Sequence, residues 1–231
     1  MSSNHLPSIS IVITAYNTGD FLRECLKSVF QEIEHIKSKV IAYEIIVIDD
    51  GSTDNLLLHI DGYISYISFF RLEKNTGRAA AKNFGLSCAQ YTIISFLDSD
   101  DICASKRYLS LLEPFSKDPK LDCVIGNVLN FSDSYKLHYS EITDGMIPGN
   151  MAIKKESLER VGLFDTNYKA CDFADWYSRF ANTSLSCAHV KKLVLHRRVH
   201  KTNSSVSHKN EYWNELFYVL RNRISIANGA A

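Results

Sequence analysis

Apolar positions in the first hundred residues follow two patterns that alternate along the chain. Short runs rich in β-branched residues predict buried strands, and between them apolar residues recur every three or four positions, which predicts helices. The predicted strands are residues 9–16, the YEIIVID run of YEIIVIDDGSTD, 63–72 and 92–97, and the predicted helices are Asp20 to Ile33 and RAAAKNFGLSCAQ. This alternation indicates an α/β protein with a mostly parallel sheet flanked by helices.

Polar residues follow three of these predicted strands, as TAYN, DDGSTD and DSDD. Ligands of open α/β sheets bind at the carboxyl ends of the strands, so the three segments are expected to share one site. With 15 Asp in 231 residues, chance gives about one D-x-D but roughly 0.06 D-x-D-D, so only the longer pattern is informative. Alone, DDGSTD would equally suit a turn with a helix N-cap.

Composition limits the classes of function. A hydrophobic content of 45% and a net charge of zero indicate a globular protein and give no sign of a nucleic-acid partner. Residues 186–231 carry eight Lys or Arg against two Glu, a local charge of +6 that leaves −6 on residues 1–185. The six cysteines form no C-x-x-C pair, so neither a zinc site nor a redox motif is expected. No signal peptide or 18-residue apolar run is present, which predicts a cytoplasmic protein.

The segments ISIVITAYN, VIDDGSTDN, NTGRAAAKNFGL and ISFLDSDD, in this order and spacing, resemble a family 2 glycosyltransferase of the GT-A fold. The resemblance covers roughly residues 7–207. It implies transfer of a sugar from a nucleotide donor, usually UDP-linked, with inversion at the anomeric carbon and with Mn²⁺ or Mg²⁺ as cofactor. It also suggests a catalytic domain at 1–207, whose nucleotide-binding half is 1–101 and whose acceptor half is 102–207, followed by a helix at 208–231.

The resemblance implies a set of donor contacts. The end of the first strand would meet uracil, Asp50 would accept its N–H in preference to the neighbouring Asp49, and Arg78 would contact the base or the diphosphate from a rigid guanidinium fork. Lys82 and Asn83 are expected only to pack. The implied nucleotide-sugar-binding residues are therefore Thr14, Ala15, Tyr16, Asp49, Asp50, Arg78, Asp98 and Ser99.

The resemblance also implies a metal site and a base. Asp100, together with His200 of HRRVHKTNSSVS, would bind the cation, and Asp101 is expected to cap the following helix. A general base for the acceptor hydroxyl is expected in LFDTNYKACDFADWYSRF at Asp172, with Asp175 as the alternative. This segment departs from the Glu-Asp pattern of the family, because Cys precedes Asp172.

The acceptor is expected to be a glycan or a lipid-linked glycan of a surface polysaccharide, lipopolysaccharide or glycoprotein. Residues 132–147, with Tyr135 and Tyr139, look like a loop or an edge hairpin on the acceptor side. A dinucleotide-binding fold would require G-x-G-x-x-G after the first strand, where this chain has TAYNTGD. The remaining alternative is a non-catalytic module that binds nucleotide-sugars or serves as a scaffold.

The C-terminal segment predicts an amphipathic helix from Lys209 to Ile226. Its apolar stripe contains Tyr212, Trp213, Leu216, Phe217, Leu220 and Ile224. The stripe either packs on the catalytic body or enters the interface of an anionic membrane, where flanking Lys and Arg would meet lipid or a lipid-linked diphosphate acceptor.

Overall fold

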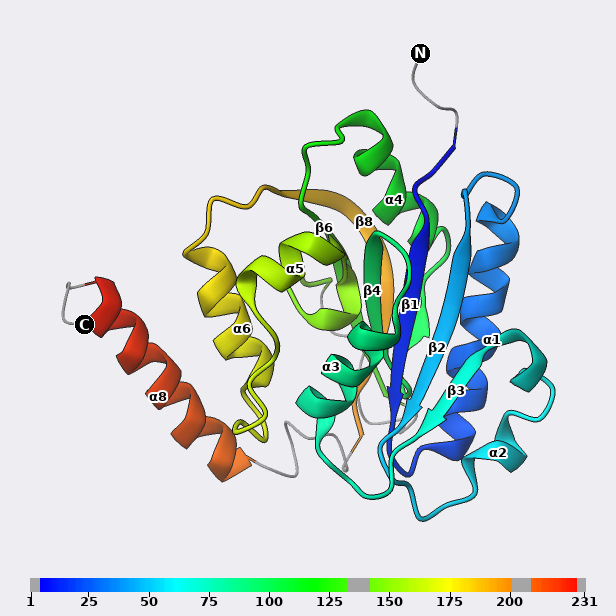
Figure 1. Ribbon diagram of the computed structural model, residues 1–231, viewed down its shortest axis with the longest axis horizontal. Helices are drawn as coiled ribbons and strands as arrows, with labels where there is room; N and C mark the ends of the chain where they lie inside the picture. Colours follow the sequence, from blue (N-terminus) through cyan, green and yellow to red (C-terminus); the bar gives the residue numbers. More distant parts are fainter. Residues whose placement is uncertain (1–4, 133–141, 201–208, 228–231) are drawn as a thin grey trace.

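The computed structural model describes residues 5–132, 142–200 and 209–227 (Figure 1). Strands and helices alternate through the first half as predicted, and antiparallel strands enter in the second half. The elements, in order, are β1 (Ile9–Ala15), α1 (Gly19–Ile36), β2 (Tyr43–Asp49), α2 (Leu56–His59), the 3₁₀ turn η1 (Ile64–Tyr66), β3 (Ser68–Arg71), α3 (Arg78–Cys88), β4 (Ile93–Asp98), β5 (Ile102–Cys103), α4 (Arg107–Lys117), β6 (Cys123–Phe131), η2 (Pro148–Asn150), β7 (Met151–Lys154), α5 (Lys155–Val161), α6 (Asp172–Ala181), β8 (Cys187–Arg198) and α8 (Lys209–Ala227).

One eight-stranded sheet, in the order β3-β2-β1-β4-β7-β6-β8-β5, runs through the described part of the chain. Strands β3, β2, β1 and β4 are parallel neighbours. Strand β7 is antiparallel to both β4 and β6, β6 is parallel to β8, and β5 is antiparallel to β8. Four of the seven pairings are thus parallel, so the prediction of a mostly parallel sheet holds for strands β1 to β4, and the complete sheet is mixed.

Helices cover both faces of the sheet (Figure 1). A hydrophobic cluster lies between the sheet and the helices on each face. Alternate residues of β1 face opposite clusters: Ile11 packs with α1 and α4, whereas Val12 packs with α3. Helices α5 and α6 complete the second cluster through Leu158 and Trp176. Burial on both faces explains why the central strands read as continuous apolar runs rather than as alternating ones.

The predicted strand at 63–72 is wrong in its first half. Residues Ile64–Tyr66 form the 3₁₀ turn η1, and only Ser68–Arg71 pair with β2. The Tyr63 ring stacks on Phe30 of α1 with the ring centroids 5.1 Å apart. This packing turns the chain back toward α1, so the apolar residues before the strand cover a helix instead of extending the sheet.

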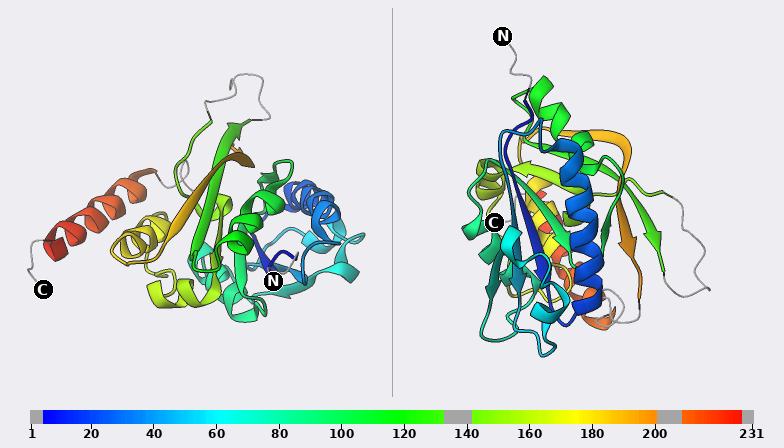
Figure 2. Two further views of the ribbon diagram at one scale, coloured as in Figure 1. Left: turned by 90° about the horizontal axis from the view of Figure 1, so that it is seen from above. Right: turned by 90° about the vertical axis from the view of Figure 1, so that its right-hand side faces the viewer.

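Helix α8 leaves the body beside α6 and extends outward (Figures 1 and 2). The residues of its predicted stripe differ in exposure: Tyr212 and Leu216 are half-buried, while Trp213 and Phe217 are 59% and 71% exposed. Val219, which lies outside the predicted stripe, is buried. The expectation that the whole stripe packs on the body is therefore wrong for the Trp213 and Phe217 side. Within the described residues, we find no helix with the length and apolar character needed to cross a membrane.

Candidate active site at the carboxyl edge of the sheet

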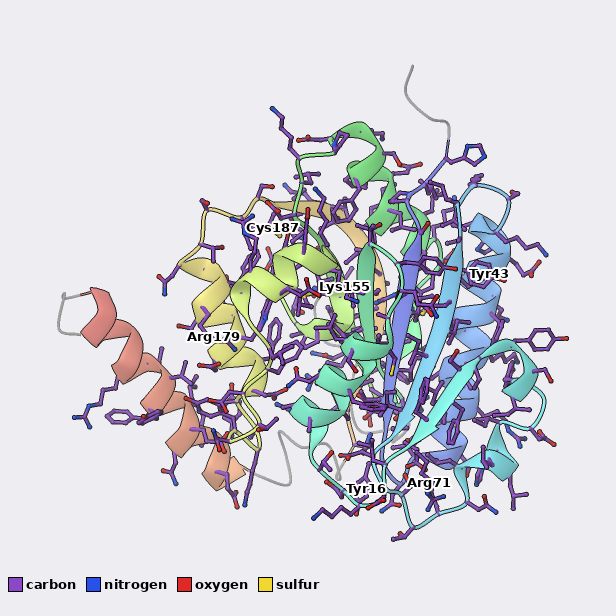
Figure 3. The ribbon with its side chains drawn as sticks, viewed as in Figure 1. Tyr16, Tyr43, Arg71, Lys155, Arg179 and Cys187 are labelled. Carbon is purple, nitrogen blue, oxygen red and sulfur yellow. The ribbon has the colours of Figure 1, made fainter. Side chains whose placement is uncertain are left out.

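The sheet brings the three predicted strand ends together at one edge. Thr14 lies in register with Asp98 of β4, and the next residue of β1, Ala15, lies in register with Asp49 of β2. Backbone hydrogen bonds continue past the strands, because the N–H of Ser99 donates to Thr14 O at 3.2 Å. Tyr16, which follows β1, is 43% exposed and lies with its ring at the lower edge of Figure 3.

The Asp49 and Asp50 carboxylates shape the loops at this edge. Asp50, 4% exposed, accepts hydrogen bonds from the backbone N–H and hydroxyl of Thr76, both at 2.7 Å, and from Gly77 N at 2.9 Å. Asp49 is fully buried, accepts a hydrogen bond from the N–H of Ser52 at 2.8 Å, and lies 3.6 Å from the Arg71 guanidinium. Asp50 thus fixes the turn that starts α3, and its carboxylate is already held in position at this edge by Thr76 and Gly77.

Asn17 links the first two loops and was not singled out by the sequence. Its backbone is left-handed, with φ of 53°, a conformation that Asn tolerates better than most residues. Its side-chain oxygen accepts hydrogen bonds from the N–H groups of Thr53 and Asp54 at 2.7 and 3.3 Å, and its own N–H donates to Ser52 Oγ. The position of Asn directly after a buried strand is the signal that could have identified it.

Asp101 does not cap the helix that follows it. Helix α4 begins at Arg107, and Glu32 Oε2 of α1 accepts a hydrogen bond from the N–H of Arg107 at 2.9 Å. Asp101 Oδ1 instead accepts a hydrogen bond from the backbone N–H of Arg198 at 2.9 Å. Strand β5 lies between Asp101 and α4. The Asp101 carboxylate therefore joins residues 98–101, here called the acidic loop, to the end of β8.

Negative charge accumulates in the acidic loop. Burial raises the pKa of Asp100, the nearby Asp98 carboxylate raises it further, and His200 opposes both effects. Burial, followed by Asp100 and Asp98, raises the pKa of Asp101 well above its ordinary value. Desolvated carboxylates that also repel one another provide a place where a cation would be stabilised.

The two predicted metal ligands lie together. His200 Nε2 is 2.8 Å from Asp100 Oδ2, and the His200 ring stacks on Phe21 with the centroids 5.1 Å apart. The neighbouring Arg198 guanidinium lies 4.7 Å from the ring centroids of both Phe21 and Phe131. These aromatic contacts hold the end of β8 against α1 and place the imidazole beside the acidic loop.

The donor atoms at this point suit a divalent cation bound together with a diphosphate. A carboxylate oxygen is a ligand that Mg²⁺ and Mn²⁺ prefer, and such ions commonly complete their shells with substrate phosphates. Within residues 5–132, 142–200 and 209–227, no group of three or more His, Cys, Asp or Glu would hold a metal ion by itself. Asp100 and His200 therefore suit a cation that takes two ligands from the protein and its remaining ligands from a bound diphosphate.

Asp172, the first residue of α6, is fully buried among cations from α3. The Arg78 guanidinium forms an ion pair with it, with Nε 2.6 Å from Oδ1, and also donates to the Ala170 carbonyl. Lys82 Nζ lies 3.6 Å from Oδ2, an atom that has no hydrogen-bond partner among the described residues. The predicted base thus has one oxygen engaged by Arg78 and the other facing Lys82.

Lys82, which was expected only to pack, is buried between two carboxylates of the site. It is 2% exposed, and its Nζ lies 3.9 Å from Asp98 as well as 3.6 Å from Asp172. The ammonium also lies 6.0 Å from the centroid of the Phe164 ring. Its position four residues after Arg78 in a predicted helix places both cations on one helical face, and this spacing was the available signal.

The alternative base, Asp175, has a different environment. Its carboxylate forms an ion pair with Arg179 one turn later in α6, with Nη2 2.9 Å from Oδ2. Arg179 also donates to the backbone carbonyls of Val161 and Leu163, and so joins α6 to the end of α5. These contacts are those of a residue that stabilises helix packing. Of the predicted acceptor-side loop, residues 133–141 lie outside the described residues, with Tyr135 and Tyr139 among them.

The sequence profile of Glycosyl transferase family 2 matches residues 10–183. The chain belongs to this family. It is 30% identical over 224 residues to glycosyltransferase GlyG of Streptococcus pneumoniae, a match that covers 95% of this chain and 68% of GlyG. It is also 30% identical over 199 residues to an Escherichia coli UDP-Gal:alpha-D-GlcNAc-diphosphoundecaprenol beta-1,3-galactosyltransferase, covering 78% of this chain and 70% of that enzyme.

Solved structures of the GT-A fold resemble this family 2 chain. TarS 1-349 of S. aureus in complex with UDP superimposes with a TM-score of 0.70 at 18% identity, over 94% of this chain and 65% of that one. GalNAc-T7 with UDP, GalNAc and Mn²⁺ superimposes with a TM-score of 0.68 at 20% identity, over 86% of this chain and 45% of that one. The chain thus spans less than two thirds of these structures, and at these identities the likeness establishes the fold.

Proposed function

We propose that this family 2 chain transfers a sugar from a UDP-sugar to an acceptor hydroxyl, with inversion and with a divalent cation. The observation that carries this proposal is the place of Lys82, whose Nζ lies within 4 Å of both Asp98 and Asp172. Asp98 ends the nucleotide-side strand and Asp172 begins the helix with the predicted base. One buried cation thus joins the donor side to the base side.

The strand ends would bind the donor. The exposed ring of Tyr16 would stack on uracil, with Asp50 accepting the uracil N–H and Asp98 and Ser99 contacting the nucleoside. Support comes from the Escherichia coli relative, which is named for UDP-Gal, and from TarS structures in complex with UDP and with UDP-GlcNAc. The donor sugar would be held between these strand ends and α6.

Asp100 and His200 would hold Mn²⁺ or Mg²⁺ together with the donor diphosphate. When bound, the cation would neutralise the charge that develops on the leaving diphosphate. The acidic loop itself would orient the donor, because Asp101 fixes this loop to β8 through the Arg198 N–H. The aromatic packing of Phe21 on His200 would keep the imidazole in place.

Asp172 would remove the proton from the acceptor hydroxyl during attack on the anomeric carbon. The carboxylate is covered, because the Arg78 side chain, 33% exposed, is paired with it. An arriving diphosphate offers Arg78 a stronger anionic partner at the same edge. Movement of the guanidinium toward the diphosphate would uncover Asp172, while Lys82 Nζ would remain beside the Asp172 carboxylate.

The acceptor would be a glycan or a lipid-linked glycan at the cytoplasmic side of a membrane. The Escherichia coli relative is named for a GlcNAc-diphosphoundecaprenol acceptor, and poly-beta-1,6-N-acetyl-D-glucosamine synthase of Staphylococcus aureus is 34% identical over 127 residues, 54% of this chain and 29% of that enzyme. The exposed Trp213 and Phe217 of α8 support peripheral attachment to an anionic membrane.

A panel of UDP-sugars, each with Mn²⁺, tests the function through UDP release in the presence of a GlcNAc-diphosphate-lipid acceptor. We expect release with one sugar donor, loss of release in EDTA, and loss in Asp100→Ala, which should keep the folded far-UV signal. Donor binding without release from any sugar would instead favour a non-catalytic module. Release that continues undiminished in excess EDTA would contradict the role of the metal.

A further inference from the structure

A single carboxylate of the C-terminal helix holds the loop that precedes the predicted base. Glu215 Oε1 accepts a hydrogen bond from the N–H of Lys169, and Oε2 accepts hydrogen bonds from the N–H groups of Ala170 and Cys171, all at 2.9 Å. Three successive backbone donors thus converge on one anion. Hydrogen bonds to an ionised acceptor are about twice as strong as neutral ones, so this contact is a strong attachment.

The position of this loop determines the position of Asp172. Cys171 is the N-cap of α6 and Asp172 is its first residue, so the backbone that Glu215 binds ends one residue before the base. A second contact from α8 reinforces the first, because the Cys171 thiol donates to the backbone carbonyl of Tyr212 at 3.3 Å. Both contacts come from one face of α8, and the paired residues lie 41 to 46 positions apart in sequence.

The loop is held from the opposite side by α3. Arg78 donates to the Ala170 carbonyl and forms the ion pair with Asp172. Ala170 therefore has its N–H bound to Glu215 and its carbonyl bound to Arg78. If Arg78 turns toward the donor diphosphate, the α8 contact is the one that still fixes the loop.

We infer that Glu215 is a positioning residue, which holds the Lys169–Cys171 backbone so that Asp172 stays in line with the acceptor hydroxyl; this inference rests on the proposed role of Asp172 as base. Helix α8 is then part of the catalytic apparatus and not only an appended segment. Its effect is on the geometry of proton removal, since the hydrogen bonds of Glu215 go to the backbone of this loop. Small displacements of a reacting group are costly, up to roughly 100-fold in rate for about 1 Å.

Glu215→Gln tests this role, because an amide keeps the size of the side chain but replaces one acceptor oxygen with an N–H₂ donor. With the UDP-sugar that gives UDP release in the panel, we expect kcat of Glu215→Gln to fall roughly 10- to 100-fold. The donor KM should stay within about twofold of wild type. Glu215→Asp keeps the carboxylate on a shorter side chain and should recover part of kcat. Glu211→Gln removes the same charge from an exposed position one turn earlier and should leave kcat unchanged.

Stability and binding measurements separate positioning from a purely structural role. If Glu215 only anchors α8, Glu215→Gln would lower the melting temperature while kcat at a permissive temperature stays at the wild-type value, which would overturn the inference. If Glu215→Gln does not fold, Glu215→Asp alone decides: a wild-type kcat in that folded variant also overturns it. Asp172→Asn, assayed beside them, keeps the two proposals apart, because full activity in that variant refutes the base and not the loop contact.

Discussion

Lys82 Nζ lies between two carboxylates, 3.6 Å from Asp172 Oδ2 and 3.9 Å from Asp98 Oδ1, and the lysine is almost completely buried. Asp172 is fully buried, whereas the Asp98 side chain is 49% exposed. A buried carboxylate is costly unless a positive group lies nearby. The same ammonium therefore offsets the cost of burying the Asp172 carboxylate at this edge of the sheet.

Lys82→Met should lower the free energy of unfolding by about 3 kcal/mol, since it removes the cation from a buried pair while the carboxylate remains. Urea denaturation measures this difference, with Lys27→Met, an exposed position on α1, as the control. The double variant Lys82→Met/Asp172→Asn should recover part of the loss, because the buried carboxylate, which then has Arg78 as its remaining cation, is also removed. If the loss of the double variant equals the sum of the losses of the two single variants, the two side chains are not coupled.

Asp172→Asn should reduce transfer by ~10²–10⁴-fold, the usual contribution of a general base, while UDP binding with Mn²⁺ is retained. Asp175→Asn should keep most of the activity, because it removes only the pair with Arg179, a contact worth ~0.3–0.5 kcal/mol on a helix surface. Steady-state transfer and titration calorimetry with UDP provide the two readouts. An inactive Asp175→Asn beside an active Asp172→Asn would reverse the assignment.

Thiol labelling should distinguish Cys171, which precedes Asp172, from Cys187, the first residue of β8. A hydrogen bond from the Cys123 thiol lowers the pKa of the exposed Cys187, whereas burial, followed by Glu215, raises the pKa of Cys171 to about 11. Because the thiolate is the reactive form, a lowered pKa gives reaction at lower pH. Iodoacetamide at pH 7.5 should therefore modify Cys187 first, with activity unchanged.

Peptide mass spectrometry over time gives the order of modification. Labelling of Cys171 should accelerate as the pH rises toward 11, whereas the labelling rate of Cys187 should reach half of its maximum below pH 9.0, the ordinary pKa of a thiol. Faster modification of Cys171 than of Cys187 at pH 7.5 would contradict the environment found for the loop before α6.

The first half of the fold could be predicted from the sequence, because its central strands are buried on both faces and leave continuous apolar runs. The helix predicted from Asp20 to Ile33 is found at Gly19–Ile36, and the strand predicted at 92–97 is found at Ile93–Asp98. The strand prediction failed for the first part of residues 63–72 because the apolar residues there pack on α1. Apolar content alone does not distinguish packing on a helix from pairing in a sheet. The mixed half of the sheet likewise depends on pairings that no local pattern specifies.

The site could be predicted only where it lies at strand ends. The segments after β1, β2 and β4 meet at one edge as expected, and His200 lies beside Asp100 as the resemblance implied. The burial of Lys82 between two carboxylates and the contact of Glu215 with the loop before α6 were missed, because each joins elements far apart in sequence. Such contacts depend on how helices pack, and the helical pattern shows only which face is apolar.

The exposed aromatic face of α8 leads to the last prediction. Trp213 and Phe217 are exposed on the side of the helix opposite the buried Val219, so one face packs on the body and the other remains available. Residues 186–231 carry the excess of eight basic over two acidic side chains. Each basic residue near an anionic surface contributes about 1 kcal/mol, an attraction that salt screens.

Co-sedimentation with phosphatidylserine-containing vesicles should therefore be strong at low salt and weak at high salt, and weak with neutral vesicles at both. Trp213→Ser/Phe217→Ser should reduce pelleting with anionic vesicles without lowering the melting temperature, because both rings are exposed. Leu216→Ser, which changes the partly buried side of the same helix, should instead lower the melting temperature. Equally negligible pelleting of wild type in all four conditions would leave α8 with its role at the Glu215 contact alone.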